Sequence, residues 1–143
     1  MKSKIGIRRL RKLQDRLREI NPLLFYMGEW GFSEHNGKPA CGTAACALGW
    51  ATSIPSFRKQ GLRMYTIPDS YTIGVELKSI SRVTSNEWNV KNAKDTSIAA
   101  AMKFFRLNRD QVYHIFLTDV LDTSTEGIEN AIKRIDNVIE GRV

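Results

Sequence analysis

Hydrophobic side chains near the start of the chain recur at intervals of three and four residues. This is the spacing of a helix with one apolar face, and the residues that follow it are Ile7, Leu10, Leu13, Leu17 and Ile20. Asn21-Pro22 ends the pattern, because a residue that precedes proline is disfavoured in the α region. We therefore expect an amphipathic helix over residues 3 to 20 that either packs on the domain or projects from it.

The most continuously apolar segment lies at residues 41 to 51 and has the sequence Cys-Gly-Thr-Ala-Ala-Cys-Ala-Leu-Gly-Trp-Ala. A helix that is apolar on every side is surrounded by other elements in a globular protein. Thr43 can serve as its N-cap, and Pro55 disfavours helix at Ile54. The pattern predicts a buried central helix over residues 44 to 53.

The remaining segments predict a hairpin followed by helices. Residues 62 to 67 and 71 to 77 are rich in β-branched and aromatic side chains, and a turn-like Pro-Asp-Ser separates them. Helical spacing returns at about residues 95 to 105, 109 to 117 and 124 to 140. Asn108 with Gln111, and Thr123 with Glu126, have the spacing of capping boxes for the last two helices.

These elements together predict a mainly helical α+β fold. The chain has 143 residues, the size of one domain, and contains no internal repeat or linker that would divide it. No run is long and apolar enough for a membrane span, and the N-terminus lacks the pattern of a secretory signal. We expect a single compact domain over residues 1 to 143 in the cytoplasm, without a membrane partner.

Positive charge is concentrated in the first helix. Residues 1 to 20 hold eight Lys or Arg and two acids, so most of the net charge of +7 belongs to them. Such a helix can be a solvated surface, a phosphate-binding stripe or a site for an acidic protein. It contains no aromatic residue for stacking on bases, which argues against single-strand binding through this helix alone. The candidate binding residues here are Arg8, Arg9, Lys12 and Arg16.

The two cysteines suggest two kinds of chemistry. A cysteine near a helix N-terminus can have a lowered thiol pKa, and His35 or His114 could act as its base, so Cys41 is the candidate nucleophile of a thiol hydrolase. That arrangement resembles papain-like enzymes, although no glutamine precedes Cys41 to build an oxyanion hole. Cys41, Cys46, His35 and His114 could instead supply four zinc ligands, but their spacing matches no zinc motif. We expect packing to be the main role of both cysteines, and no cofactor.

Residues 98 to 117 have roughly the spacing of a helix-turn-helix. The second helix would present Arg109, Asp110, Tyr113 and His114 to DNA. However, Arg106 replaces the usual turn glycine, and Asp110 would face phosphates. A plain pair of antiparallel helices is the alternative interpretation.

Three motifs carry a resemblance to known proteins. They are Cys41-Gly-Thr-Ala-Ala-Cys46-Ala-Leu-Gly-Trp-Ala51, Phe105-Arg-Leu-Asn-x-x-Gln111-x-x-x-Ile115-Phe116 and Phe25-x-Met27-x-x-Trp30. With them the chain resembles a group of small proteins of bacteriophage and bacterial genomes that share a CGTxxCxxGWA motif and have no established activity. The resemblance implies a phage accessory protein.

The resulting hypothesis is that this protein binds a host protein in the cytoplasm, for instance in counter-defence or host takeover, without catalysis. Nucleic-acid binding, through the basic first helix and residues 98 to 117, is the first alternative. A thiol hydrolase that uses Cys41 is the second.

Overall fold

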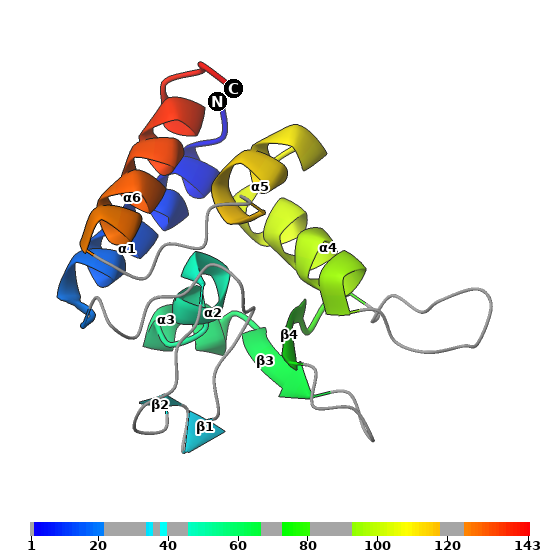
Figure 1. Ribbon diagram of the computed structural model, residues 1–143. Coiled ribbons are helices and arrows are strands. Elements are labelled where there is room, and N and C mark those ends of the chain that lie inside the picture. The colour runs from blue at the N-terminus through cyan, green and yellow to red at the C-terminus, as the bar shows by residue number, and fades with distance from the viewer. Residues whose placement is uncertain are drawn as a thin grey trace.

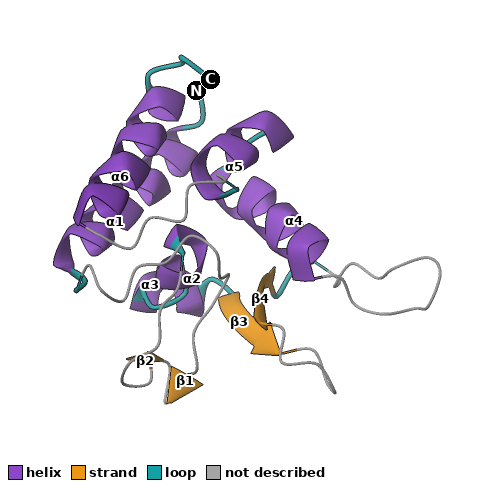
Figure 2. Ribbon diagram, in the orientation of Figure 1, coloured by secondary structure: helices purple, strands orange, loops and turns teal. Residues whose placement is uncertain are grey.

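A computed structural model describes residues 2–21, 34–35, 38–39, 46–66, 73–80, 93–117 and 125–143. The protein has a mainly helical α+β fold, and the described residues form two small antiparallel sheets (Figures 1 and 2). In chain order the elements are α1 Lys4–Glu19, β1 Glu34–His35, β2 Lys38–Pro39, α2 Ala47–Ala51, α3 Pro55–Lys59, β3 Leu62–Thr66, β4 Ile73–Leu77, α4 Ala93–Phe105, α5 Arg109–Phe116 and α6 Thr125–Ile139.

Helix α1 forms where the apolar spacing predicts it. The Ser3 side chain caps its start by accepting a hydrogen bond from the amide of Gly6, and the backbone becomes extended at Ile20. Its apolar stripe is buried, with Leu10, Leu13 and Leu17 fully inaccessible to solvent. The helix packs lengthwise beside α6 and also contacts α2 and α4 (Figure 1). It is therefore docked on the domain rather than projecting from it.

The central helix is shorter than the sequence predicted. Helix α2 spans Ala47–Ala51, and its N-cap is Cys46, which makes no capping bond through its side chain. The expected cap, Thr43, lies outside the described residues. Thr52 is the C-cap, and the amides of Thr52 and Ser53 donate to the carbonyls of Gly49 and Trp50, three residues back. The hydroxyls of Thr52 and Ser53 donate to the same two carbonyls. The predicted span of 44 to 53 was therefore wrong at both of its ends.

A second short helix follows directly. Helix α3 begins at Pro55, whose ring fixes a helical φ and which has no amide proton to leave without a partner at a helix start.

Every described residue from Cys46 to Ala51 is buried, so the prediction of an apolar centre holds for this part of the segment.

The predicted hairpin is present as strands β3 and β4. Leu62 pairs with Leu77 and Tyr65 with Gly74 in the antiparallel register. The Tyr65 ring lies directly over Gly74, where an added Cβ would approach the ring to 2.8 Å. The hairpin is held against α4, in part because the buried Ser97 hydroxyl accepts a hydrogen bond of 3.0 Å from the amide of Val75.

Helices α4 and α5 are joined by a tight turn. Arg106 has a φ of 58°, the left-handed conformation that usually falls to glycine after a helix, and the amide of Leu107 donates back to the carbonyl of Met102. Asn108 and Gln111 then form the predicted capping box, with reciprocal bonds of 2.9 and 3.0 Å. The cap predicted for the last helix, Thr123, lies outside the described residues.

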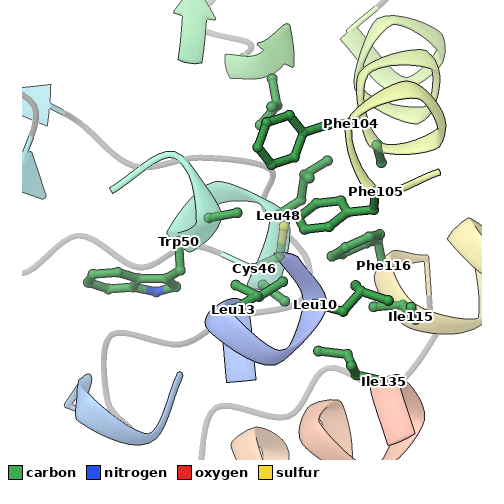
Figure 3. Packing of buried hydrophobic residues seen from close by; sticks show 14 of the residues in the cluster. Leu10, Leu13, Cys46, Leu48, Trp50, Phe104, Phe105, Ile115, Phe116 and Ile135 are labelled. Carbon is green, nitrogen blue, oxygen red and sulfur yellow. The ribbon is translucent and has the colours of Figure 1, made fainter. Parts of the chain in front are cut away.

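The core lies where α1, α2, α4, α5 and α6 meet. Phe104 and Phe105 pack edge to face with each other and with Phe57, and Phe105 also contacts Phe116. Figure 3 shows the rings of Phe104, Phe105 and Phe116 near Cys46 and Leu48 of the central segment. The buried faces of α1 and α6 close the cluster on the other side, with Leu10 and Ile135 pointing into it.

Candidate functional site

The candidate cysteine site is only partly described. Cys46 forms no disulfide and is buried in the core, with 1% of its surface exposed. Cys41 and the side chain of His35 lie outside the described residues. A thiol as inaccessible as that of Cys46 is not available to a substrate, and its position among apolar side chains is that of a packing residue.

His114, the other candidate base and metal ligand, lies on α5 with its Nε2 buried. This nitrogen has no hydrogen-bond partner among the described residues. Burial and the nearby charge of Arg134 both lower the pKa of His114, so the neutral imidazole is favoured. Within the described ranges, no three His, Cys, Asp or Glu side chains are grouped so as to hold a metal ion.

Some cations of the basic first helix contact other elements, and others are exposed to solvent. Arg9 belongs to the first group and lies on one flank of the helix, where it contacts the ends of α3 and α4. Its Nη1 donates to the carbonyl of Phe104 at 2.6 Å, and its Nη2 donates to the side-chain oxygen of Gln60. Its guanidinium also lies 4.1 Å from the centroid of the Phe104 ring.

These acceptors suit a half-buried cation, although none of them is a carboxylate. Phe104 is in the last turn of α4, where the helix dipole is negative, and Gln60 follows the end of α3. Burial and the neighbouring charge of Arg106 nevertheless lower the pKa of Arg9. Arg9 thus links α1 to the C-terminal ends of α3 and α4.

The same flank carries Arg16, about two turns further along the helix. Its Nε donates to the Ser53 hydroxyl at 3.0 Å, and its guanidinium lies 5.4 Å from the Trp50 ring. Arg9 and Arg16, two of the four candidate binding residues on this helix, are therefore engaged inside the fold.

The opposite flank of α1 is fastened to α6. Gln14 is buried, and its amide donates to the carbonyl of Ile132 at 3.0 Å and to Oδ1 of Asp136 at 2.9 Å. Arg11 adds an ion pair to the same carboxylate at 2.6 Å. The bond from Gln14 and the charge of Arg11 lower the pKa of Asp136.

The outward face of α1 presents a different set of cations. Lys4, Arg8 and Lys12 follow each other at intervals of four residues, and all three are exposed. This spacing places them in a row, about 6 Å apart along the helix axis. Within the described part of the chain none of them forms an ion pair. We call these three residues the α1 row.

Ile5 lies on the edge of the α1 row and is 46% exposed. It is one of the few large apolar side chains on the described surface, the others being Tyr113 and Val143. The row is limited to the first half of α1, because Asp15 and Glu19 occupy the outward positions of the second half and pair with Arg18 and Arg16.

The positions predicted for a DNA-reading helix lie on α5. Arg109, Asp110 and Tyr113 are exposed, whereas His114 is half-buried. The Tyr113 ring has two cationic neighbours, Arg109 at 5.7 Å and Lys94 at 5.8 Å from its centroid. Lys94 belongs to the start of α4 and was not singled out from the sequence, because nothing in the local pattern links it to α5.

Comparison with known proteins adds no relative: no family model, no curated protein and no solved structure matches this chain. Among the described helices none is long and apolar enough to cross a membrane. The candidate sites therefore rest on the residues themselves, namely the α1 row and the surface around Tyr113.

Proposed function

We propose that this protein acts by binding an acidic host protein through the α1 row, as an accessory protein of phage type in the host cytoplasm and without catalysis. The observation that carries the proposal is the division of charge on α1. The fold uses the arginines on the flanks, and it leaves Lys4, Arg8 and Lys12 exposed without ion pairs among the described residues. Charges that the fold does not use are available to a partner.

A protein suits this surface better than a nucleic acid. The α1 row holds three cations over two helical turns, and the next outward positions are the acidic Asp15 and Glu19, which would repel a continuing phosphate backbone. The exposed Ile5 offers an apolar contact beside the charges. An apolar contact with charges around it is a common arrangement in protein interfaces.

The test is a capture experiment from host lysate, with and without nuclease treatment. The informative variant reverses the α1 row, K4E/R8E/K12E, and the matched control reverses three exposed lysines elsewhere, K78E/K103E/K133E. Both variants change the net charge equally, so only position differs between them. We expect the first to lose the partner and the second to retain it, with the affinity of the purified pair reduced at least about tenfold by the first.

Two outcomes would contradict the proposal. If both variants lose the partner equally, net charge and not the α1 row is responsible. If nuclease treatment removes the captured protein, a nucleic acid mediates the interaction, and the partner is not bound through direct protein contact.

A further inference from the structure

The surface around Tyr113 combines an accessible aromatic ring with two cations from different helices. Tyr113 is 37% exposed on α5, Arg109 is one turn before it on the same helix, and Lys94 reaches it from α4. No ion pair joins Lys94 or Arg109 to a carboxylate within the described residues. We call these three residues the Tyr113 patch.

Stability of the helices does not explain these cations. Lys94 and Arg109 lie in the first turns of α4 and α5, where the positive end of the helix dipole disfavours a positive charge. The acids that suit those turns, Asp95 and Asp110, are present beside them. The two cations are therefore placed against the local electrostatics.

The cations over the Tyr113 ring lie well away from its face, and the side chain remains 37% exposed. The contrast is with Phe104, where the guanidinium of Arg9 lies at 4.1 Å from the ring centroid and the ring itself is buried. Around Tyr113 both cations are more than 1.5 Å further away, at 5.7 and 5.8 Å. The exposed ring can thus receive a planar group, and the two cations stay near enough to contact the charges of that ligand.

We propose that the Tyr113 patch binds single-stranded nucleic acid. One base stacks on the Tyr113 ring, and Lys94 and Arg109 contact the phosphates on either side of that base. A flat aromatic surface beside cations is the usual way in which proteins bind single strands without regard to sequence. This site is separate from the α1 row, which has no aromatic residue.

A single strand fits this patch better than a duplex. Asp110 is exposed on the same short helix, so a duplex that received α5 in its groove would bring phosphates against this carboxylate. A single strand can pass over the ring and avoid Asp110. Stacking on the Tyr113 ring also needs a base with an exposed face. The bases inside a duplex are stacked on their neighbours and offer no such face.

The experiment measures fluorescence anisotropy of labelled oligothymidine and oligouridine of about 12 nucleotides, a length within the usual site size. We expect Tyr113→Ala to weaken binding roughly tenfold, and Tyr113→Phe to retain it because the ring remains. The double change K94Q/R109Q should weaken binding and flatten its dependence on salt. Asp110→Asn should strengthen binding. The control K78Q/K133Q removes two exposed lysines elsewhere and should have a smaller effect than K94Q/R109Q.

The outcomes separate this proposal from the one for α1. Loss of oligonucleotide binding in K4E/R8E/K12E with no effect of Tyr113→Ala would place the nucleic-acid site on the α1 row and overturn the inference. Equal affinity for a duplex would also overturn it, as would a response to polyglutamate but not to oligonucleotides, which would indicate an acidic protein ligand. Circular dichroism checks that each variant is folded, which is expected because the side chains are exposed.

Discussion

The flanks of α1 and its outward face carry similar residues and have different roles. On the flanks, Arg9 and Arg11 are bonded to residues of α4 and α6 that lie 95 and 125 positions away along the chain. On the outward face, Arg8 and Lys12 are each adjacent in sequence to one of these arginines and have no ion pair within the described ranges. The rotation of about 100° between successive helical residues decides which cation stabilises the fold and which is left for a partner.

This difference means that charge density alone does not identify a binding surface. Three of the five arginines of the first helix bond to other parts of the protein, namely Arg9, Arg11 and Arg16. Only after these are accounted for does the α1 row remain as a candidate surface. The same comparison can be tested by substitutions at neighbouring positions.

The largest effect is expected for Gln14→Leu. This change removes the side-chain amide that donates to the Ile132 carbonyl and to the Asp136 carboxylate. Gln14 is 1% exposed, so water cannot easily replace the lost donor. We expect a loss of about 2 kcal/mol in the free energy of unfolding, measured by urea denaturation. Lys12→Leu, on the outward face, is the control and should change stability by less than about 0.5 kcal/mol. Equal effects of the two changes would contradict the different roles of the flank and the outward face of α1.

A smaller effect is expected for Arg9→Ala. The change removes the bonds to Phe104 and Gln60 together with the contact to the Phe104 ring. The expected loss is about 1 to 2 kcal/mol. Arg8→Ala truncates the same side chain one position earlier and should be close to neutral in the same denaturation experiment. A destabilised Arg8→Ala would show that the α1 row contributes to the fold.

Arg106→Gly should stabilise the protein, by up to about 1 kcal/mol, because glycine adopts the positive φ of this position without strain. It also removes the charge that opposes Arg9. The gain should be smaller in the background of Arg9→Ala, where that repulsion is already absent. A double-mutant cycle, from the melting curves of the wild type, both single variants and the double variant, measures the coupling. A coupling of zero would indicate that only the backbone conformation matters.

The pH dependence of stability should show two separate windows. The pKa of His114 is lower in the folded protein, so the stability that it contributes is present above its ordinary pKa of 6.5 and declines as pH falls below that value. The pKa of Asp136 is lowered too, and its contribution declines only below the ordinary value of 3.8. The melting temperature should therefore fall in two steps as the pH is lowered. His114→Gln should remove the first step and leave the second, whereas an unchanged profile would mean that His114 is not the group responsible.

Much of the local structure could be predicted because it depends on neighbouring residues. The apolar face of α1, the hairpin and the Asn108–Gln111 capping box each result from spacings of two to four residues. The end of α2 could not be predicted in the same way. Thr52 and Ser53 are compatible with helix by pattern, and only the folded chain shows that their hydroxyls bond to the carbonyls of Gly49 and Trp50.

The sequence could not separate the candidate binding residues of the first helix from one another. Arg8 and Lys12 are exposed, whereas Arg9 and Arg16 contact other elements, which depends on where α3, α4 and Ser53 lie. Arg109 and Tyr113 were linked by their helical spacing, but Lys94 joins them only through the packing of α4 on α5. Contacts between residues distant in sequence are set by tertiary packing, which no local pattern encodes.

The bonds between α1 and distant residues also determine when this helix can finish packing during synthesis of the chain. The first helix leaves the ribosome before its partners Phe104, Ile132 and Asp136, which follow after about several seconds at ordinary rates of translation. Until then α2, which is made earlier, can cover only part of its buried leucines. A chain that stops before α6 would leave one side of that helix uncovered.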